Sequence, residues 1–309
     1  MTKRLKNFIS SKLFNLDYAG SGVYNYYRLL TYTVPSKSQI ALVTVGRNDD
    51  YMPDFYQRMK ATLSWNTKYL VSEPIFVEWN PPQDRELLAF RLTKEFPAIK
   101  VFVVPGTIHK KVCQNSNLAL MEYHAKNVGI RRARSKWIIS SNADVAISPK
   151  TIRKCLKFTC DNKASEMFIA RTAERVDIDW GQRSTGEMNL FDFIAFKKII
   201  TTSRYGTGDF LMATNSLWHS IKGYDERLQK HRVGCDVRGA AQMVAHLASM
   251  ESIGQVLHFA HPTSCTEAGI QPHHGENASL DGIPYINSEN WGLTDYTENQ
   301  IGERVWLLG

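Results

Sequence analysis

The residues with the clearest potential for chemistry lie between Glu122 and Asp144. The sequence there reads EYHAKNVGIRRARSKWIISSNAD and ends on Asn142-Ala143-Asp144, directly after a short apolar run. Such a run predicts a buried strand, with the Asp144 carboxylate at its carboxyl end. Open α/β sheets bind ligands in the crevice beyond the carboxyl ends of their strands. The segment therefore predicts a ligand site that contains an acidic side chain.

Strands and helices alternate along the part of the chain that would position this site. Apolar runs of strand length, typical of buried parallel strands, occur at 40–45, 74–79, 99–104 and 136–141. Between them, helices are expected at 52–65, 84–96 and 117–134. This repetition implies an α/β fold, with a Rossmann-like, mostly parallel mixed sheet flanked by helices.

Beyond Pro149 the alternation is less regular. We expect helices at 151–159, 215–221 and 237–250, and strands at 167–171, 210–214 and 255–259. A polar stretch over 175–189 predicts a mobile loop, and Gly181 to Gly186 and Asn287 to Leu293 are candidate lid elements. The expected organisation is an N-terminal helical extension over 1–38, a main domain over 39–260 with halves 39–148 and 149–260, and a C-terminal coil over the site at 261–309.

Composition narrows the class of partner. The chain has 309 residues, 43% of them apolar, which is enough for a substantial core. Its formal charge of +8 favours anionic partners such as nucleotide phosphates, acidic lipids or nucleic acid.

Five scattered cysteines without a C-x-x-C pair argue against a disulfide framework, so a reducing, cytoplasmic location fits best. No apolar run predicts a transmembrane helix, and the basic N-terminal segment leaves a peripheral membrane contact as an alternative.

An ordered series of motifs resembles the GT-A fold glycosyltransferases, specifically the family-2-like enzymes that use nucleotide-diphosphate sugars. The segments similar to that family's helix, DXD-type, acceptor-strand, turn and second-helix motifs are Lys126 to Ile130, Trp137 to Asp144, Gly208 to Met212, Lys222 to Glu226 and Cys235 to Val237. The resemblance implies a GT-A catalytic domain over 39–260 with a C-terminal acceptor-side elaboration. It also implies sugar transfer from a nucleotide-diphosphate donor, with UDP the expected nucleotide, to a hydroxyl on a glycan, lipid or protein.

The resemblance assigns Asp144 to a divalent metal ion. The diphosphate that leaves in sugar transfer accumulates negative charge, which Mn²⁺ or Mg²⁺ held by carboxylate oxygens stabilises. Asn142 replaces the first acid of the motif and offers a neutral oxygen or a hydrogen bond to ribose, so a metal-independent enzyme stays open. A C-terminal histidine is the further ligand implied, with His261 favoured over His258, which falls within a predicted strand. Capping of the following helix is the alternative role for Asn142 and Asp144.

Two carboxylates are candidates for catalysis at the acceptor. A hydroxyl acceptor loses its proton as the new bond forms, and a carboxylate at the mouth of the site can accept that proton. The resemblance places Asp236 in this role, although Cys235 stands where the family has Glu. Asp209, at the start of the acceptor-side strand, is the second candidate. A helix N-cap is the alternative role for Asp236.

The ends of the first two strands predict the nucleoside site. Glu78 or Asp49 would accept hydrogen bonds from ribose or uracil, and Arg47 would meet phosphate. Val45 and Asn48 belong to the same strand end. Two further residues, Lys126 and Asn127, stand where the resembled family contacts nucleotide, and a solvated basic helix face is the alternative for Lys126.

Three other functions stay open from the sequence. A sugar-phosphate nucleotidyltransferase would share the sheet and a carboxylate-held metal, but Val45 to Asp49 carries a single glycine where that class has a glycine-rich phosphate loop. A non-catalytic nucleotide-sugar-binding relative is compatible with Asn142 and Cys235. Binding of nucleic acid ranks low, because the basic residues are spread along the chain and are not interleaved with aromatic ones.

Overall fold

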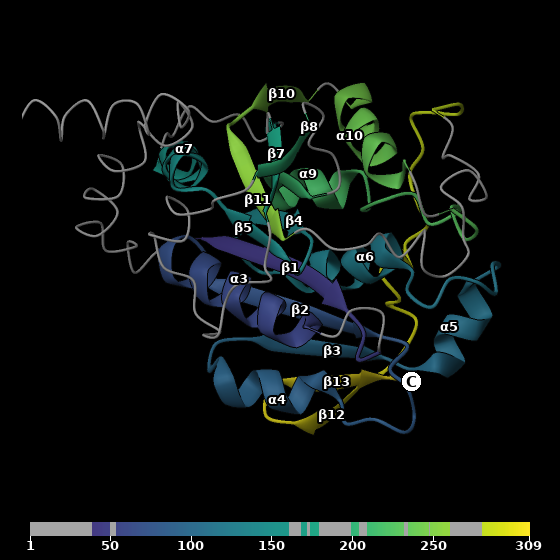
Figure 1. Ribbon diagram of the computed structural model, residues 1–309. Coiled ribbons are helices and arrows are strands. Elements are labelled where there is room, and N and C mark those ends of the chain that lie inside the picture. Colours follow the sequence, from purple (N-terminus) through teal and green to yellow (C-terminus); the bar gives the residue numbers. More distant parts are fainter. Residues whose placement is uncertain are drawn as a thin grey trace, which may run out of the picture.

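The computed structural model describes residues 39–49, 54–160, 168–171, 174–178, 199–203, 209–231, 234–246, 248–259 and 280–309. Within these residues the strands form a nine-stranded sheet and a four-stranded sheet (Figure 1). The expected N-terminal helical extension, the lid candidate from Gly181 to Gly186 and the ligand candidate His261 lie outside the described residues.

The nine-stranded sheet has four parallel strands at its centre. They are β1 (Ile40–Gly46), β2 (Glu73–Trp79), β3 (Lys100–Val104) and β4 (Trp137–Ser141). The strands beside them are β6 (Phe168–Arg171), β9 (Phe210–Thr214), β10 (Ser249–Ser252), β12 (Glu298–Gly302) and β13 (Val305–Leu308). The strand order is β10-β6-β9-β4-β1-β2-β3-β13-β12.

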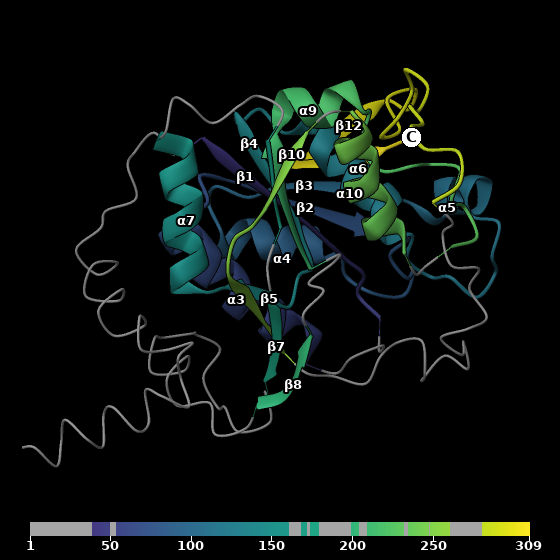
Figure 2. The ribbon, with the colours of Figure 1, turned by 90° about the horizontal axis from the view of Figure 1, so that it is seen from above.

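Helices cover both faces of this sheet. They are α3 (Phe55–Tyr69), α4 (Leu88–Glu95), α5 (Gly106–Val112), α6 (Glu122–Arg132), α7 (Pro149–Cys160), α9 (Asn215–Ser220) and α10 (Cys235–Ala245). In β1, Ile40 and Leu42 join the core beneath α3 and α4, whereas Ala41 and Val43 join the core beneath α6 and α9. Figure 2 shows the central strands between these two pairs of helices. The predicted α/β fold with a mostly parallel mixed sheet is confirmed.

The order of the central strands creates a crevice beside β1. The chain passes from β1 to β2 and β3 on one side of β1, and β4 then pairs in parallel with the opposite side of β1. At such a reversal of strand order the connections leave in opposite directions, which opens a crevice at the carboxyl ends of the two strands. Gly46 and Ser141 end the strands on either side of that crevice.

Antiparallel pairing brings a later part of the chain to the same edge. Strand β9 pairs antiparallel with β4, with Phe210 opposite Ser141. The residue before β9, Asp209, therefore lies next to the residue after β4, Asn142. This pairing joins two motifs that are far apart in the sequence.

Helix α6 approaches the sheet closely because of one glycine. A Cβ atom at Gly129 would lie 2.5 Å from Cγ1 of Val43 on β1, a distance that side chains do not tolerate. Glycine at this position therefore allows the helix backbone to pack directly on the central strands. The same packing places the side chains of Lys126 and Asn127 in the interior.

The sequence analysis expected coil over 261–309, but part of this region forms strands. Its end forms the hairpin β12–β13, and β13 extends the main sheet by pairing in parallel with β3. The hairpin covers an edge of the sheet that would otherwise be open to other strands. Trp306 stacks on Phe102 of β3, with 5.2 Å between the ring centroids, so aromatic packing supports the added strand.

The second sheet also differs from expectation. It consists of β5 (Val145–Ile147), β7 (Glu174–Ile178), β8 (Ile199–Ser203) and β11 (Gln255–Phe259), in the order β5-β11-β7-β8. The start of the predicted loop at 175–189 is thus part of β7, because β11 and β8 pair with it on both sides. In Figure 2 the strands β5, β7 and β8 lie on the side of the molecule away from α9.

Two further observations concern location and redox state. Within the described part of the chain, no helix has the length and apolar character needed to cross a membrane. The cysteines that the structure describes in atomic detail, Cys113, Cys155 and Cys235, carry free thiols.

Candidate functional site

Polar side chains converge at the carboxyl end of β4. The Asn142 side-chain nitrogen donates a hydrogen bond to Oδ1 of Asp209 at 3.2 Å, and the Ser141 hydroxyl donates to the Asp209 backbone carbonyl. Asp209 is 6% exposed, so its carboxylate is largely shielded from solvent. The structure thus brings Asn142 and Asp209, both predicted site residues, into direct contact.

Asp144 lies two residues further along and contacts a histidine. Its Oδ2 atom is 3.2 Å from Nε2 of His258, which is the fourth residue of β11. The antiparallel pairing of β11 with β5 places His258 opposite Val145, the neighbour of Asp144. Both side chains are buried, with exposed fractions of 7% for Asp144 and 4% for His258. His258, which the sequence analysis ranked below His261, is therefore the histidine that the structure places beside Asp144.

Asp144 and His258 have the chemistry of metal ligands. A carboxylate oxygen and an imidazole nitrogen are both acceptable donors for Mn²⁺. Within the described residues, no cluster of three His, Cys, Asp or Glu side chains could hold a metal ion by itself. Ions of this type commonly take one or two protein carboxylates and complete their coordination with substrate phosphates and water. The two side chains therefore fit a metal ion that is held jointly with a diphosphate.

Lys126 connects this edge of the sheet with helix α6. Its side chain is fully buried, and its ammonium donates to Oδ1 of Asn142 at 2.8 Å and to Oε1 of Glu122 at 2.5 Å. A solvated basic helix face, the alternative that the sequence left open for Lys126, does not apply, because the residue is interior. The i,i+4 spacing of Glu122 and Lys126 was the sequence signal for their ion pair.

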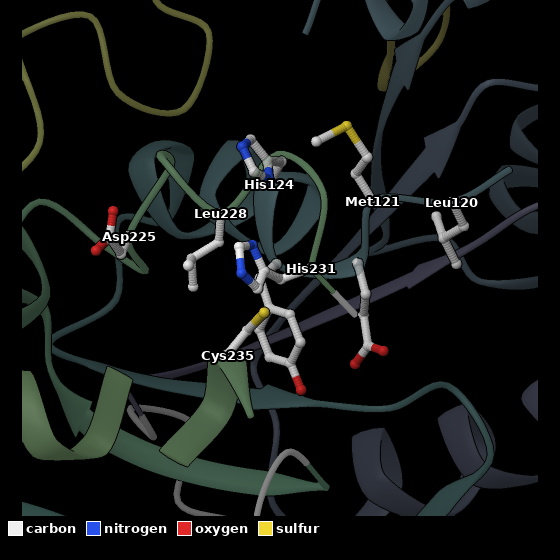
Figure 3. A pocket seen from close by; sticks show the side chains of 9 residues that line it. Leu120, Met121, His124, Asp225, Leu228, His231 and Cys235 are labelled. Atoms are coloured by element: carbon white, nitrogen blue, oxygen red, sulfur yellow. The ribbon is translucent and has the colours of Figure 1, made fainter. Parts of the chain in front are cut away.

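A cleft lies beside this network, between the start of α6 and the start of α10. Figure 3 shows His124, His231 and Cys235 among the side chains that line it. Its lining residues are Leu120, Met121, Glu122, Tyr123, His124, Asp225, Leu228, His231 and Cys235. Because Glu122 both lines the cleft and binds Lys126, the cleft adjoins the polar group at the end of β4.

Asp236 stands in the first turn of α10, directly after the cleft residue Cys235. Its side chain is half-buried, and in the described part of the chain no hydrogen bond or ion pair engages its carboxylate. The N-cap of α10 is Gly234, so the alternative role of Asp236 as N-cap does not apply. The structure thus leaves the Asp236 carboxylate available at the side of the cleft.

Burial keeps the His124 imidazole and the Cys235 thiol in the cleft neutral. Desolvation lowers the pKa of His124 to about 4, so its imidazole is neutral at physiological pH and donates to the Glu226 carbonyl. Burial also raises the pKa of the Cys235 thiol to about 12, which keeps the sulfur protonated and unsuited to nucleophilic attack. Neither group is therefore charged in the cleft at neutral pH.

Hydrogen bonds hold the loop after β1 in place. Arg47 donates to Oδ2 of Asp49 and to the Asn80 carbonyl, both at 2.6 Å, and Asn48 donates to the Glu86 carbonyl at 2.7 Å. These contacts hold the loop against the end of β2. Val45, 5% exposed, contributes its side chain to the core, so only its backbone faces the crevice. Arg47 and Asp49 are half-buried and remain candidates for a nucleoside or phosphate contact.

Glu78 is a correction to the predicted nucleoside site. Its carboxylate has no exposed surface and accepts hydrogen bonds from the backbone N–H groups of Leu88 and Ala89, at 2.9 and 3.0 Å. Those groups begin helix α4, whose N-cap residue offers no side-chain acceptor. Both oxygens therefore satisfy the helix terminus, and Glu78 has a structural role.

Asn127 is a second correction. Its side-chain amide donates to the Tyr224 carbonyl and to Glu226, and it accepts from the Tyr224 N–H at 2.7 Å. Gly223 packs so closely on this amide that a Cβ atom there would lie 2.3 Å from the Asn127 side-chain oxygen. Asn127, which has no exposed surface, therefore binds the turn at 222–226.

Comparison with known proteins adds two solved structures. No protein-family model matches the sequence, and no curated protein matches it. The chain is similar to the mannosyltransferase PcManGT from Pyrobaculum calidifontis, described in complex with GDP-Man and Mn²⁺, with 13% identity, a TM-score of 0.43, and coverage of 82% of this chain and 69% of that one. It is also similar to S. aureus TarS 1–349, with 13% identity, a TM-score of 0.40, and coverage of 74% of this chain and 62% of that one.

Proposed function

We propose that the chain is a glycosyltransferase that moves a sugar from a nucleotide-diphosphate donor to a hydroxyl acceptor. The observation that carries the proposal is the pairing of Asp144 with His258 beside Asn142 and Asp209, at the carboxyl end of β4. That position adjoins the crevice where open α/β sheets bind nucleotides. The order of motifs along the sequence supports the same class of enzyme.

The proposed donor site lies between β1 and β4. Asp144 and His258 would hold Mn²⁺ or Mg²⁺ together with the diphosphate, and the ion would supply charge compensation for the leaving group. Arg47 and Asp49, in the loop after β1, would contact the nucleoside or its phosphates. The region 39–148 thus corresponds to the nucleotide half of the proposed enzyme.

The proposed acceptor side is the cleft next to Asp236. An acceptor hydroxyl there would pass its proton to the Asp236 carboxylate as the oxygen attacks the anomeric carbon of the sugar. This role suits a carboxylate that is half-buried and not engaged by another described group. The other carboxylates at the cleft are paired, Glu122 with Lys126 and Asp225 with two arginines, so Asp236 is the carboxylate that remains for this role.

A panel of donors tests the proposal. UDP-sugars and GDP-sugars would be added with and without Mn²⁺, and both the melting temperature and the release of nucleoside diphosphate would be measured. We expect one donor to stabilise the protein in a Mn²⁺-dependent way and to release its nucleoside diphosphate. Release of pyrophosphate from a nucleoside triphosphate and a sugar phosphate would indicate a nucleotidyltransferase instead. Absence of stabilisation and turnover with all donors would contradict the proposal.

A further inference from the structure

Lys126 is buried in a place where packing alone does not explain a lysine. The Lys126 side chain has an exposed fraction of 0%. The residue belongs to α6, the helix that packs against the central strands. Removing an ammonium from water costs several kcal/mol, and lysine is almost never fully buried unless it is paired. The contacts that compensate this cost therefore indicate what the residue does.

The described contacts of the ammonium join helix α6 to the end of β4, and the ammonium also lies 4.9 Å from the centroid of the Tyr123 ring on the same helix. The ammonium pairs with Glu122 one turn earlier on α6, at 2.5 Å, and donates to Oδ1 of Asn142 at 2.8 Å. An ammonium can only donate hydrogen bonds, so it selects the oxygen end of the Asn142 amide. The nitrogen end of the same amide is thereby turned toward Asp209.

The oriented amide in turn fixes a carboxylate. The Asn142 nitrogen donates to Oδ1 of Asp209 at 3.2 Å, while the backbone carbonyl of Asp209 is held by Ser141. The carboxylate thus receives support both through its side chain and through its backbone. An aspartate at position 142 would instead set a second negative charge beside Asp209, and like charges at such a separation repel.

We propose that Lys126 is a positioning residue of the transfer site: through the amide of Asn142 it orients the Asp209 carboxylate to accept hydrogen bonds from hydroxyl groups of the donor sugar. This role rests on the proposed function. It also gives a physical reason for asparagine in place of aspartate at position 142, because an amide can accept from Lys126 and donate to Asp209 at the same time, whereas an ionised carboxylate can only accept.

A double-mutant cycle tests this role with the donor found in the panel above. We expect Lys126→Met to lower kcat about tenfold or more, with donor KM changed less than about threefold, because misorientation acts on the reacting geometry. Stabilisation by the free nucleoside diphosphate should stay at the wild-type level. In the cycle, Lys126→Met should cost nothing further once Asp209→Asn is present.

Two more variants separate positioning from folding. Asn142→Asp keeps an acceptor for Lys126 but removes the donor to Asp209, so we expect the same loss of kcat. Its melting temperature should fall less than that of Lys126→Met, because the new carboxylate keeps Lys126 paired. Lys100→Met is the matched control, since Lys100 forms a 2.7 Å ion pair with Glu73 at the opposite, amino end of the strands. Its kcat should be that of the wild type.

The possible outcomes distinguish the positioning role of Lys126 from the proposed function of the protein. Wild-type turnover together with additive effects of Lys126→Met and Asp209→Asn would overturn the positioning role, as would full kcat in Asn142→Asp. If Lys126→Met fails to fold, Asn142→Asp decides alone. A wild-type protein without turnover on any donor would overturn the proposed function, and with it the role of Lys126.

Discussion

His258 lies against Asp144, with 3.2 Å between Nε2 of the imidazole and Oδ2 of the carboxylate. Asp144 lies between β4 of the larger sheet and β5 of the smaller one, and His258 belongs to β11, which pairs with β5. The backbone carbonyl of Asp144 also accepts from the Phe259 N–H of β11. The pair therefore lies where the smaller sheet meets the carboxyl end of β4.

The first prediction concerns this pair. Asp144→Asn should abolish Mn²⁺-dependent stabilisation by the donor and lower turnover roughly 100-fold or more, because charge compensation by a metal ion contributes several kcal/mol to such reactions. His258→Gln should have a smaller effect of the same kind. The exposed Asp295 provides a matched control, Asp295→Asn, which should behave as the wild type. Equal Mn²⁺ dependence in Asp144→Asn would exclude this carboxylate as a ligand.

The second prediction separates binding from transfer at Asp236. Asp236→Asn should keep the donor-induced rise in melting temperature and lose roughly 10²- to 10⁴-fold in kcat, the usual contribution of a general base. The variant is nearly isosteric, and no described hydrogen bond depends on the carboxylate. Transfer at the wild-type rate would show that another group accepts the proton.

The third prediction uses one carboxylate shared by two arginines. Asp225 accepts from Arg238 and from Arg227, each at 2.7 Å, and these bonds lower its pKa below the ordinary value although burial opposes them. The side chain of Arg238 is 4% exposed and that of Arg227 is 49% exposed. We therefore expect Arg238→Met to cost about 3–5 kcal/mol of unfolding free energy and Arg227→Met less than about 1 kcal/mol.

Denaturant unfolding of the two arginine variants would measure this difference. Arg238 belongs to α10, the helix that carries Asp236, so its loss should also reduce turnover. Similar unfolding free energies for the two variants would mean that burial does not determine the strength of these ion pairs.

The fourth prediction concerns the dependence of stability on pH. Burial raises the pKa of Glu78 to about 7 from its ordinary value of 4.5, so between these pH values the folded state keeps a proton that the unfolded state has released. The contribution of Glu78 to stability is therefore complete below pH 4.5 and is lost as the pH rises through 7. His124 acts oppositely, because its pKa is lowered to about 4 and the unfolded state binds the proton first.

The Glu78→Gln variant should reveal the contribution of Glu78 to the pH dependence of the unfolding free energy, which is opposite in sign to that of His124. Its unfolding free energy relative to the wild type should increase between pH 4.5 and 7, on top of a constant loss from the amide that now faces a backbone N–H of α4. Urea unfolding at pH 4.5, 5.5 and 7 would measure this. A pH-independent difference between the two proteins would mean that Glu78 does not titrate in this range.

The sequence predicted the parts of the fold that local pattern determines. The apolar runs of β1 to β4 and the helices between them follow from composition and periodicity, and they place Asn142 and Asp144 at a strand end. Pairing partners were harder to predict. Strands β5 and β12 are short or polar, and they are strands because β11 and β13 offer them open edges. No local signal reveals such a partner.

The role of a site residue was predictable from the sequence only where it does not depend on a partner from another part of the chain. Glu78 and Asn127 carry the expected functional groups in the expected places, but their hydrogen bonds go to backbone groups at 88–89 and at 224. The sequence around each residue contains no trace of those partners. Similarly, the sequence predicts that His258 lies in a strand, and only the pairing of β11 with β5 brings it to Asp144.

The parallel pairing of β13 with β3 has a consequence for dissecting the molecule. A fragment made of residues 39–148 would hold the whole proposed nucleotide half, yet it would lack the strand that borders β3. Its outer edge would present unpaired backbone groups and the bare face of Phe102, a surface prone to self-association. Expression of that half by itself should therefore yield aggregates unless the hairpin at 298–308 is supplied as well.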